Sequence, residues 1–269
     1  MNGSMSSSVA FAKAKAADRA ALIGYLPAGF PSVKGAIEAV KVMVDGGCDM
    51  IEIGLPYTDP LMDGATVQDA VHRALVGGVH VADVFRTVEA VAATGVPALV
   101  MTYWNPVDRY GVDAFARDLK GAGGAGLITP DLTPEEAGSW LAAADHHDLD
   151  KVFLVALSST DERIATITSI CRGFVYAASL MGVTGTRGAV DTGAARLVER
   201  TRAHTTLPVG LGLGVGTGSQ AAEVAAFADG VIVGSAFIRR LLDAPSHKAG
   251  LDELRKLTVE LASGVRRPT

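Results

Sequence analysis

The stretch 50-MIEIGLPYTDPLMDG-64 joins a short apolar run to a segment rich in turn-forming residues. Residues 50–54 are too few for a helix and apolar on both faces, which is typical of a parallel strand that is covered on each side. The acidic residue Glu52 interrupts this run, and Asp59 and Asp63 follow in the turn. A carboxylate in a buried strand is costly unless something uses it. The stretch therefore bears on both the fold and the function.

Similar short apolar runs recur along the chain, separated by longer alanine-rich segments with helical spacing, such as 33–47, 112–123 and 219–230. The other runs are residues 21–25, 98–103, 125–129, 151–157, 174–179, 208–214 and 230–235. Eight strand–helix units in a chain of 269 residues predict an α/β fold, a single-domain (β/α)8 TIM barrel. An open doubly wound sheet is the alternative, but the even repeat and the lack of a second domain favour the barrel.

The domain organisation predicted from the sequence is simple. No Pro/Ser-rich linker and no long charge run marks a boundary. We expect a flexible N-terminal tail over residues 1–10 and one catalytic barrel domain over residues 11–269.

The composition is that of an ordinary soluble protein, with 49 % apolar residues, 20 % charged residues and a formal net charge of −5. This mild acidity gives no support for binding nucleic acid or an anionic membrane surface. No apolar stretch is long enough to cross a bilayer, and the first ten residues do not resemble a secretory signal. The two cysteines, Cys48 and Cys171, have no metal-ligand spacing and are interpreted as free thiols in a reducing cytoplasm.

The chemistry of a barrel enzyme belongs at the C-terminal ends of its strands. No lysine in the sequence stands at such an end, which argues against a Schiff base, and no histidine stands there to hold a metal. Acid–base chemistry by carboxylates remains, with Glu52 and either Asp59 or Asp63 as candidates.

The alternation of side chains along a strand predicts where Glu52 points. Met50, Glu52 and Gly54 share one face, and Ile51 and Ile53 share the other. If the isoleucines pack on the helices, Glu52 points into the barrel mouth, where partial desolvation raises its pKa. The structural alternative is a buried glutamate paired with an arginine, and both aspartates could instead be turn formers.

A phosphate site is predicted at the end of the seventh and eighth strands. The stretch 209-VGLGLGVGTGSQ-220 and the pair Gly234-Ser235 offer backbone N–H groups and a helix N-terminus to an anion. The alternative is that these glycines serve only tight strand–helix turns. Residues 182–193, with Thr184 and Arg187, are rich in glycine at both ends, as expected for a mobile lid.

Several motifs in this order resemble the tryptophan synthase α subunit family. They are the stretch quoted first, 24-GYLPAGFP-31, 101-MTYWNP-106, 126-GLITPDLTPEE-136, 176-YAASLMGVTGTRG-188 and 234-GS-235. The resemblance covers nearly the whole chain. It implies a cytoplasmic lyase of tryptophan biosynthesis that cleaves indole-3-glycerol phosphate to indole and glyceraldehyde 3-phosphate. Indole would pass to a β subunit in an αββα heterotetramer.

The resemblance also assigns roles residue by residue. Glu52 matches the general acid–base, Asp63 the carboxylate that accepts the indole N–H, and Tyr176 the hydroxyl that orients Glu52. Five positions match substrate-binding residues. Thr184 matches the residue that bonds Asp63 when the site closes, and the phosphate-binding backbone groups match Gly185, Gly214, Gly234 and Ser235. Asp59 and Pro60 match the interface with the β subunit. The family implies no metal and no cofactor in this chain, and pyridoxal phosphate in the β subunit.

Three places differ from forms found in the family: Leu213 stands in place of a Phe against the indole ring, Leu180 stands in place of an Arg, and the turn at residues 156–160 lacks a proline. Two other functions share the motifs. One is a stand-alone indole-3-glycerol-phosphate lyase, and the other is a catalytically idle phosphate-binding barrel that regulates a partner.

Overall fold

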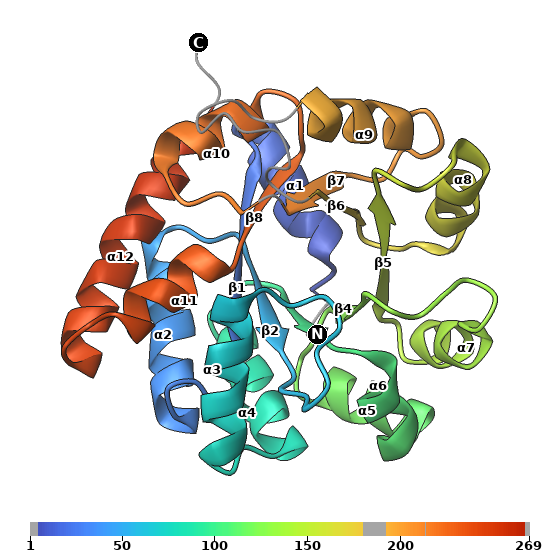
Figure 1. Cartoon of the computed structure of the whole chain (residues 1–269). Helices are drawn as coiled ribbons and strands as arrows, with labels where there is room; N and C mark the ends of the chain where they lie inside the picture. Colours follow the sequence, from blue (N-terminus) through green and yellow to red (C-terminus); the bar gives the residue numbers. More distant parts are fainter. Residues whose placement is uncertain (1–4, 180–191, 213, 267–269) are drawn as a thin grey trace.

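The computed structural model describes residues 5–179, 192–212 and 214–266, and its strands close into a barrel (Figure 1). Every neighbouring pair is parallel, and the strands follow one another around the barrel in sequence order. The strands are β1 (Ala21–Pro27), β2 (Met50–Gly54), β3 (Ala98–Met101), β4 (Gly126–Thr129), β5 (Asp150–Ala156), β6 (Val175–Ala178), β7 (Val209–Gly212) and β8 (Gly230–Val233). The predicted (β/α)8 barrel is confirmed, and the open sheet is excluded because β1 pairs with β8.

Helices α2 to α12 lie around the barrel, and α1 precedes its first strand (Figure 1). They are α1 (Ser7–Ala16), α2 (Val33–Gly46), α3 (Ala65–Val76), α4 (Val81–Ala92), α5 (Trp104–Tyr110), α6 (Val112–Gly121), α7 (Gly138–His146), α8 (Asp161–Ile170), α9 (Thr192–Arg202), α10 (Gly218–Ala225), α11 (Ser235–Leu242) and α12 (His247–Gly264). Helix α2 illustrates the local rules. The Ser32 hydroxyl caps its first turn by accepting the Gly35 N–H at 3.0 Å, and Gly47 ends it in the left-handed conformation with φ 115°.

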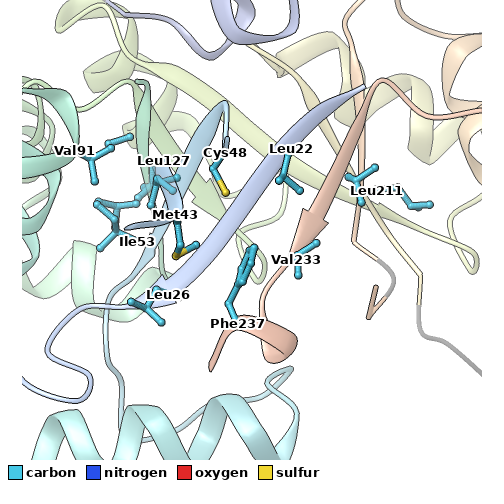
Figure 2. Packing of buried hydrophobic residues seen from close by; sticks show 14 of the residues in the cluster. Leu22, Leu26, Met43, Cys48, Ile53, Val91, Leu127, Leu211, Val233 and Phe237 are labelled. Atoms are coloured by element: carbon cyan, nitrogen blue, oxygen red, sulfur yellow. The ribbon is translucent and has the colours of Figure 1, made fainter. Parts of the chain in front are cut away.

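Apolar side chains form two separate layers of core. The outer layer lies between the strands and the helices, and it includes Ile51 and Ile53 of β2. Figure 2 shows part of this layer, with Ile53 among its labelled residues. The inner layer fills the barrel with side chains such as Ile23, Met50 and Phe174. Alternate residues of each strand therefore face opposite layers, as the two-residue period of a strand requires.

Helix α1 closes the barrel at the end where the strands begin. Its residues Ala10, Phe11 and Ala14 belong to the inner core layer, and the Phe11 ring lies 5.2 Å from that of Phe174 at the start of β6. The opposite end, where the strands end, is called the mouth of the barrel here.

The predicted boundary of the N-terminal tail at residue 10 is wrong, because α1 begins at Ser7. The Ser6 hydroxyl caps the helix, and Ser7 donates to the buried Asp150 carboxylate from its backbone N–H at 2.7 Å and from its hydroxyl at 2.6 Å. These polar residues, which resembled a loose tail in the sequence, anchor α1 to the start of β5. Residues 1–4 of the predicted tail lie outside the described residues.

Candidate active site

Glu52 occupies the middle of β2, and its side chain points into the barrel. Its neighbours Ile51 and Ile53 pack in the outer core layer, and Met50 packs in the inner one. The pleat of the strand therefore places Glu52 on the inward face, as predicted. In the parallel register, Tyr25 of β1 and Leu99 of β3 lie beside it.

The Glu52 carboxyl group is fully buried, and neither of its oxygens has a hydrogen-bond partner among the described residues. The structural alternative, a pair with an arginine, is therefore absent from the described part of the chain. Burial raises the pKa of Glu52 to about 8, because the charged form loses its hydration without a compensating partner. A carboxyl group with this pKa is protonated at neutral pH and can act as a proton donor.

Tyr176 lies on β6, the strand directly across the barrel from β2 in the closed order of eight. Burial raises its pKa well above the usual value, and the charge of Glu52 adds to that rise. A Cβ atom on Gly212 of β7 would lie 2.6 Å from the Tyr176 hydroxyl oxygen. Glycine at this position thus leaves the space that the phenol occupies at the mouth.

Asp63 ends the loop that follows β2 and is half-buried. Burial raises its pKa, and a hydrogen bond from the Tyr103 hydroxyl opposes that rise by stabilising the carboxylate. The loop is held at this point by two further contacts. The Tyr103 hydroxyl accepts the Met62 backbone N–H at 2.9 Å, and the Gln68 side chain donates to the Asp63 carbonyl at 2.7 Å.

Two tyrosines of the site, Tyr25 and Tyr103, were missed in the sequence. The pKa of Tyr25 is raised well above its usual value by burial, then by the charges of Asp63 and Glu52. Its phenol therefore lies within range of the charges of both carboxyl groups. A tyrosine in an apolar run is read as core, but Tyr25 lies opposite Glu52 in the register. That pairing is the signal that could have revealed it.

The predicted phosphate end lies beside β1. Helix α11 begins at Ser235, directly after β8, and its N-cap residue Gly234 has no side-chain cap. The first N–H groups of the helix can thus serve an anion. A Cβ on Gly234 would lie 3.2 Å from the Tyr25 ring, and Gly214 has the left-handed φ of 74°. Glycine is therefore favoured at position 234 by the nearby ring and at position 214 by the backbone conformation, apart from any role in binding an anion.

The loop from Pro56 to Gly64 also carries the predicted interface residues. Asp59 is exposed and accepts the Thr58 hydroxyl at 2.5 Å, and Pro60 is half-buried. The next two side chains are apolar and unusually open, Leu61 with 79 % and Met62 with 57 % of its surface exposed. An exposed apolar pair beside a site is typical of a surface that another protein covers.

Some predicted residues cannot be placed. Thr184 and Gly185, the whole predicted lid up to residue 191, and the two unusual positions Leu180 and Leu213 lie outside the described residues. Among the residues that the structure does describe, no group of three or more His, Cys, Asp or Glu side chains is arranged to hold a metal ion. Within the same residues, no helix has both the length and the apolar character that crossing a bilayer requires.

Comparison with known proteins agrees with this geometry. The family model described as tryptophan synthase alpha chain matches residues 11–266. The tryptophan synthase alpha chain of Salinispora arenicola is 63 % identical over 260 residues, covering 97 % of each chain. That of Streptomyces coelicolor is 61 % identical over 256 residues, covering 95 % of this chain and 94 % of the relative.

Solved structures give the same result. Tryptophan synthase from M. tuberculosis, in an open form, has a chain that matches with a TM-score of 0.90 and 53 % identity, covering 98 % of this chain and 100 % of that one. A chain of the tryptophan synthase complex from Pyrococcus furiosus matches with a TM-score of 0.82 and 29 % identity, covering 91 % and 98 %. With its barrel, its buried glutamate and these relatives, the chain belongs to the tryptophan synthase alpha chain family.

Proposed function

We propose that this chain cleaves indole-3-glycerol phosphate to indole and glyceraldehyde 3-phosphate by carboxylate acid–base catalysis. The observation that carries the proposal is the Glu52 carboxyl group, which is buried at the barrel mouth, has no hydrogen-bond partner among the described residues and has a pKa raised to about 8. A structural glutamate would be paired, whereas a proton donor has to remain available to its substrate.

The proposed reaction moves two protons through Glu52. The protonated carboxyl group donates its proton to C3 of the indole ring, which leaves a positive charge on the ring. The bond between C3 and the glycerol chain then breaks, and its electron pair returns to the ring. The glycerol hydroxyl on the departing carbon becomes an aldehyde and returns its proton to the Glu52 carboxylate. Positioned acid–base catalysis of this kind typically contributes about 10²–10⁴-fold.

Asp63 and Tyr176 assist this step in the proposal. The Asp63 carboxylate accepts the indole N–H and stabilises the cation that develops on the ring, an effect that is strong in a site shielded from water. In the proposal Tyr176 orients Glu52 when substrate is bound. The Tyr176 hydroxyl makes no hydrogen bond to the Glu52 carboxyl group in the structure, but the Glu52 charge raises its pKa.

The phosphate of the substrate is assigned to the N-terminus of α11. Gly234 and Ser235 supply backbone N–H groups there, and Gly214 supplies the turn after β7. The Tyr25 ring occupies the space beside Gly234, and the charge of Asp63 acts on its phenol, so Tyr25 lies between the phosphate end and the carboxyl groups. No metal and no cofactor of this chain takes part in the proposed reaction.

We also propose that the product indole passes to a pyridoxal-phosphate-dependent β subunit in an αββα assembly in the cytoplasm. The exposed loop with Asp59, Pro60, Leu61 and Met62 is the surface offered to that partner. The relatives named above are alpha chains, which favours a subunit over a stand-alone lyase or an idle barrel. Both cysteines are free thiols, which suits a reducing compartment.

The test is indole formation by Glu52→Gln, with and without β subunit. Glutamine keeps the shape of the side chain but cannot donate a carboxyl proton, so turnover should fall at least about 100-fold while substrate binding remains. Glu89→Gln is the matched control, because Glu89 is exposed on the outer helix α4. Normal turnover by the Glu52 variant would refute the proposed proton donor.

A further inference from the structure

Tyr103 lies at a firmly held point of the barrel mouth. It lies two residues after the end of β3, precedes the first residue of α5, and has only 6 % of its surface exposed. On its N-terminal side, the Thr102 N–H donates to the Ile128 carbonyl of β4 at 3.1 Å. On its C-terminal side, the Trp104 N–H donates to the Asp131 carboxylate, at 2.9 and 3.1 Å to its two oxygens. The backbone of Tyr103 is thereby fixed to the neighbouring strand and its loop.

The Tyr103 hydroxyl makes two contacts with the loop after β2. It accepts the Met62 backbone N–H at 2.9 Å, and it lowers the pKa of the neighbouring Asp63 by stabilising that carboxylate. Because a hydroxyl can both accept and donate, the same group that fixes the loop backbone one residue before Asp63 can also favour the ionised form of that carboxyl group. The Tyr103 ring also packs against Tyr57 at the start of the same loop, with ring centroids 5.8 Å apart.

The loop needs such an anchor because little else at its outer edge is buried. Leu61 and Met62 project outward, with 79 % and 57 % of their surfaces exposed. The very next residue, Asp63, points its carboxylate toward the site. A loop with few buried contacts is readily displaced, and a displacement of about 1 Å at a reacting group can cost about 100-fold in rate.

We infer that Tyr103 is a positioning residue, whose hydroxyl fixes the Asp63 carboxylate where the indole N–H has to be met. This inference rests on the proposed function, since it names the group that makes Asp63 effective. Tyr103 itself does not exchange a proton with the substrate. Its contribution is to hold Asp63 in place and to favour the ionised form of that carboxyl group.

The ionisable groups around Asp63 determine how its pKa changes when the Tyr103 hydroxyl is removed. The Tyr103 hydroxyl lowers the pKa of Asp63. On the β1 side, the charge of Asp63 contributes to the raised pKa of Tyr25. Without the Tyr103 hydroxyl, burial alone remains as the main cause of the shift, and the pKa of Asp63 rises. Since Asp63 acts as a carboxylate, activity should then appear only at higher pH.

The test compares Tyr103→Phe with the wild type in the assembled complex with β subunit. We expect kcat to fall about tenfold or more, as for loss of a hydrogen bond to a charged group. The acid limb of the pH profile of kcat/KM should move to higher pH. Tyr110→Phe is the matched control. It also removes a tyrosine hydroxyl bonded to an aspartate, Asp118 at 2.7 Å, but on the exposed end of α5. That variant should behave like the wild type.

A double-mutant cycle with Asp63→Asn separates positioning from a general structural effect. If Tyr103 acts through Asp63, adding Tyr103→Phe to Asp63→Asn should cost little further activity. Fully additive losses, or a lower kcat with an unmoved acid limb, would overturn the inference. A wild-type complex that forms no indole would instead refute the proposed function.

Discussion

At the scale of single residues, Glu52 shows how burial determines reactivity. An exposed glutamate is ionised at neutral pH, but the pKa of Glu52 is about 8 because its carboxyl group is buried without a hydrogen-bond partner among the described residues. The same burial makes the residue unfavourable for folding whenever it has to be charged. A site that contributes to catalysis should therefore reduce stability in a pH-dependent way.

We expect Glu52→Gln to stabilise the protein increasingly as the pH rises. In the unfolded chain, Glu52 ionises near its usual pKa of 4.5, whereas in the folded chain it ionises near 8. The wild type therefore loses folding stability between these two values, and glutamine does not. Urea unfolding should show little difference between the two at pH 5 and a gain of a few kcal/mol for the variant at pH 9, since each pKa unit corresponds to about 1.4 kcal/mol. Equal differences at both pH values would contradict the raised pKa.

At the scale of elements, the ends of the strands are shaped by glycines that make room for tyrosines. Gly54 at the end of β2 leaves space for the Tyr25 hydroxyl, with which a Cβ would collide, and Gly212 at the end of β7 leaves space for that of Tyr176. Gly212 belongs to the stretch that suggested an anion site in the sequence, so it has a second role. Both glycines admit phenol groups into the space around the two carboxyl groups.

Gly212→Ala should therefore disturb both stability and activity. Its Cβ would lie 2.6 Å from the Tyr176 hydroxyl oxygen, so the phenol has to shift. Overpacking of this kind costs about 1–3 kcal/mol in the free energy of unfolding, and indole formation should fall with it. Gly121→Ala, with nothing within 4 Å of the added atom, is the control and should be neutral in both measurements. Adding Tyr176→Phe should recover part of the lost stability, and no recovery would argue against this contact.

At the scale of the whole molecule, a helix that precedes the first strand, α1, covers the end of the barrel where the strands begin. Phe11 of α1 packs against Phe174, and its ring occupies the space that glycine leaves at position 230. Ser6, Ser7 and the buried Asp150 fix the beginning of this helix. The interior of the barrel is thereby sealed opposite the mouth.

Removing this seal should destabilise the fold as a whole. We expect Phe11→Ala to lower the free energy of unfolding by about 3–5 kcal/mol, the usual range for loss of a buried phenylalanine. Val9→Ala on the same helix is the control, because Val9 is 41 % exposed and should change stability by less than about 1 kcal/mol. Denaturant titration followed by circular dichroism measures both variants. Similar values for the two would show that α1 does not close the core.

The strands and the inward direction of Glu52 could be predicted from the sequence, because a parallel strand covered on both sides requires a short apolar run. Each predicted strand is present with ends within two residues of the prediction. Helix α1 could not be predicted, because its buried face has one large apolar residue, Phe11, among small and polar ones, and the partners Asp150 and Phe174 lie far away in the chain.

The sequence by itself determined the family of this protein, the eightfold repeat and the two acidic residues of the candidate site. Only the tertiary structure decided that Glu52 has no hydrogen-bond partner among the described residues, and that Tyr25 and Tyr103 are near the carboxyl groups. The physical reason is that burial and pKa depend on side chains from several strands, which closure of the barrel brings together. Local periodicity can predict the direction of a side chain, but not which groups it meets.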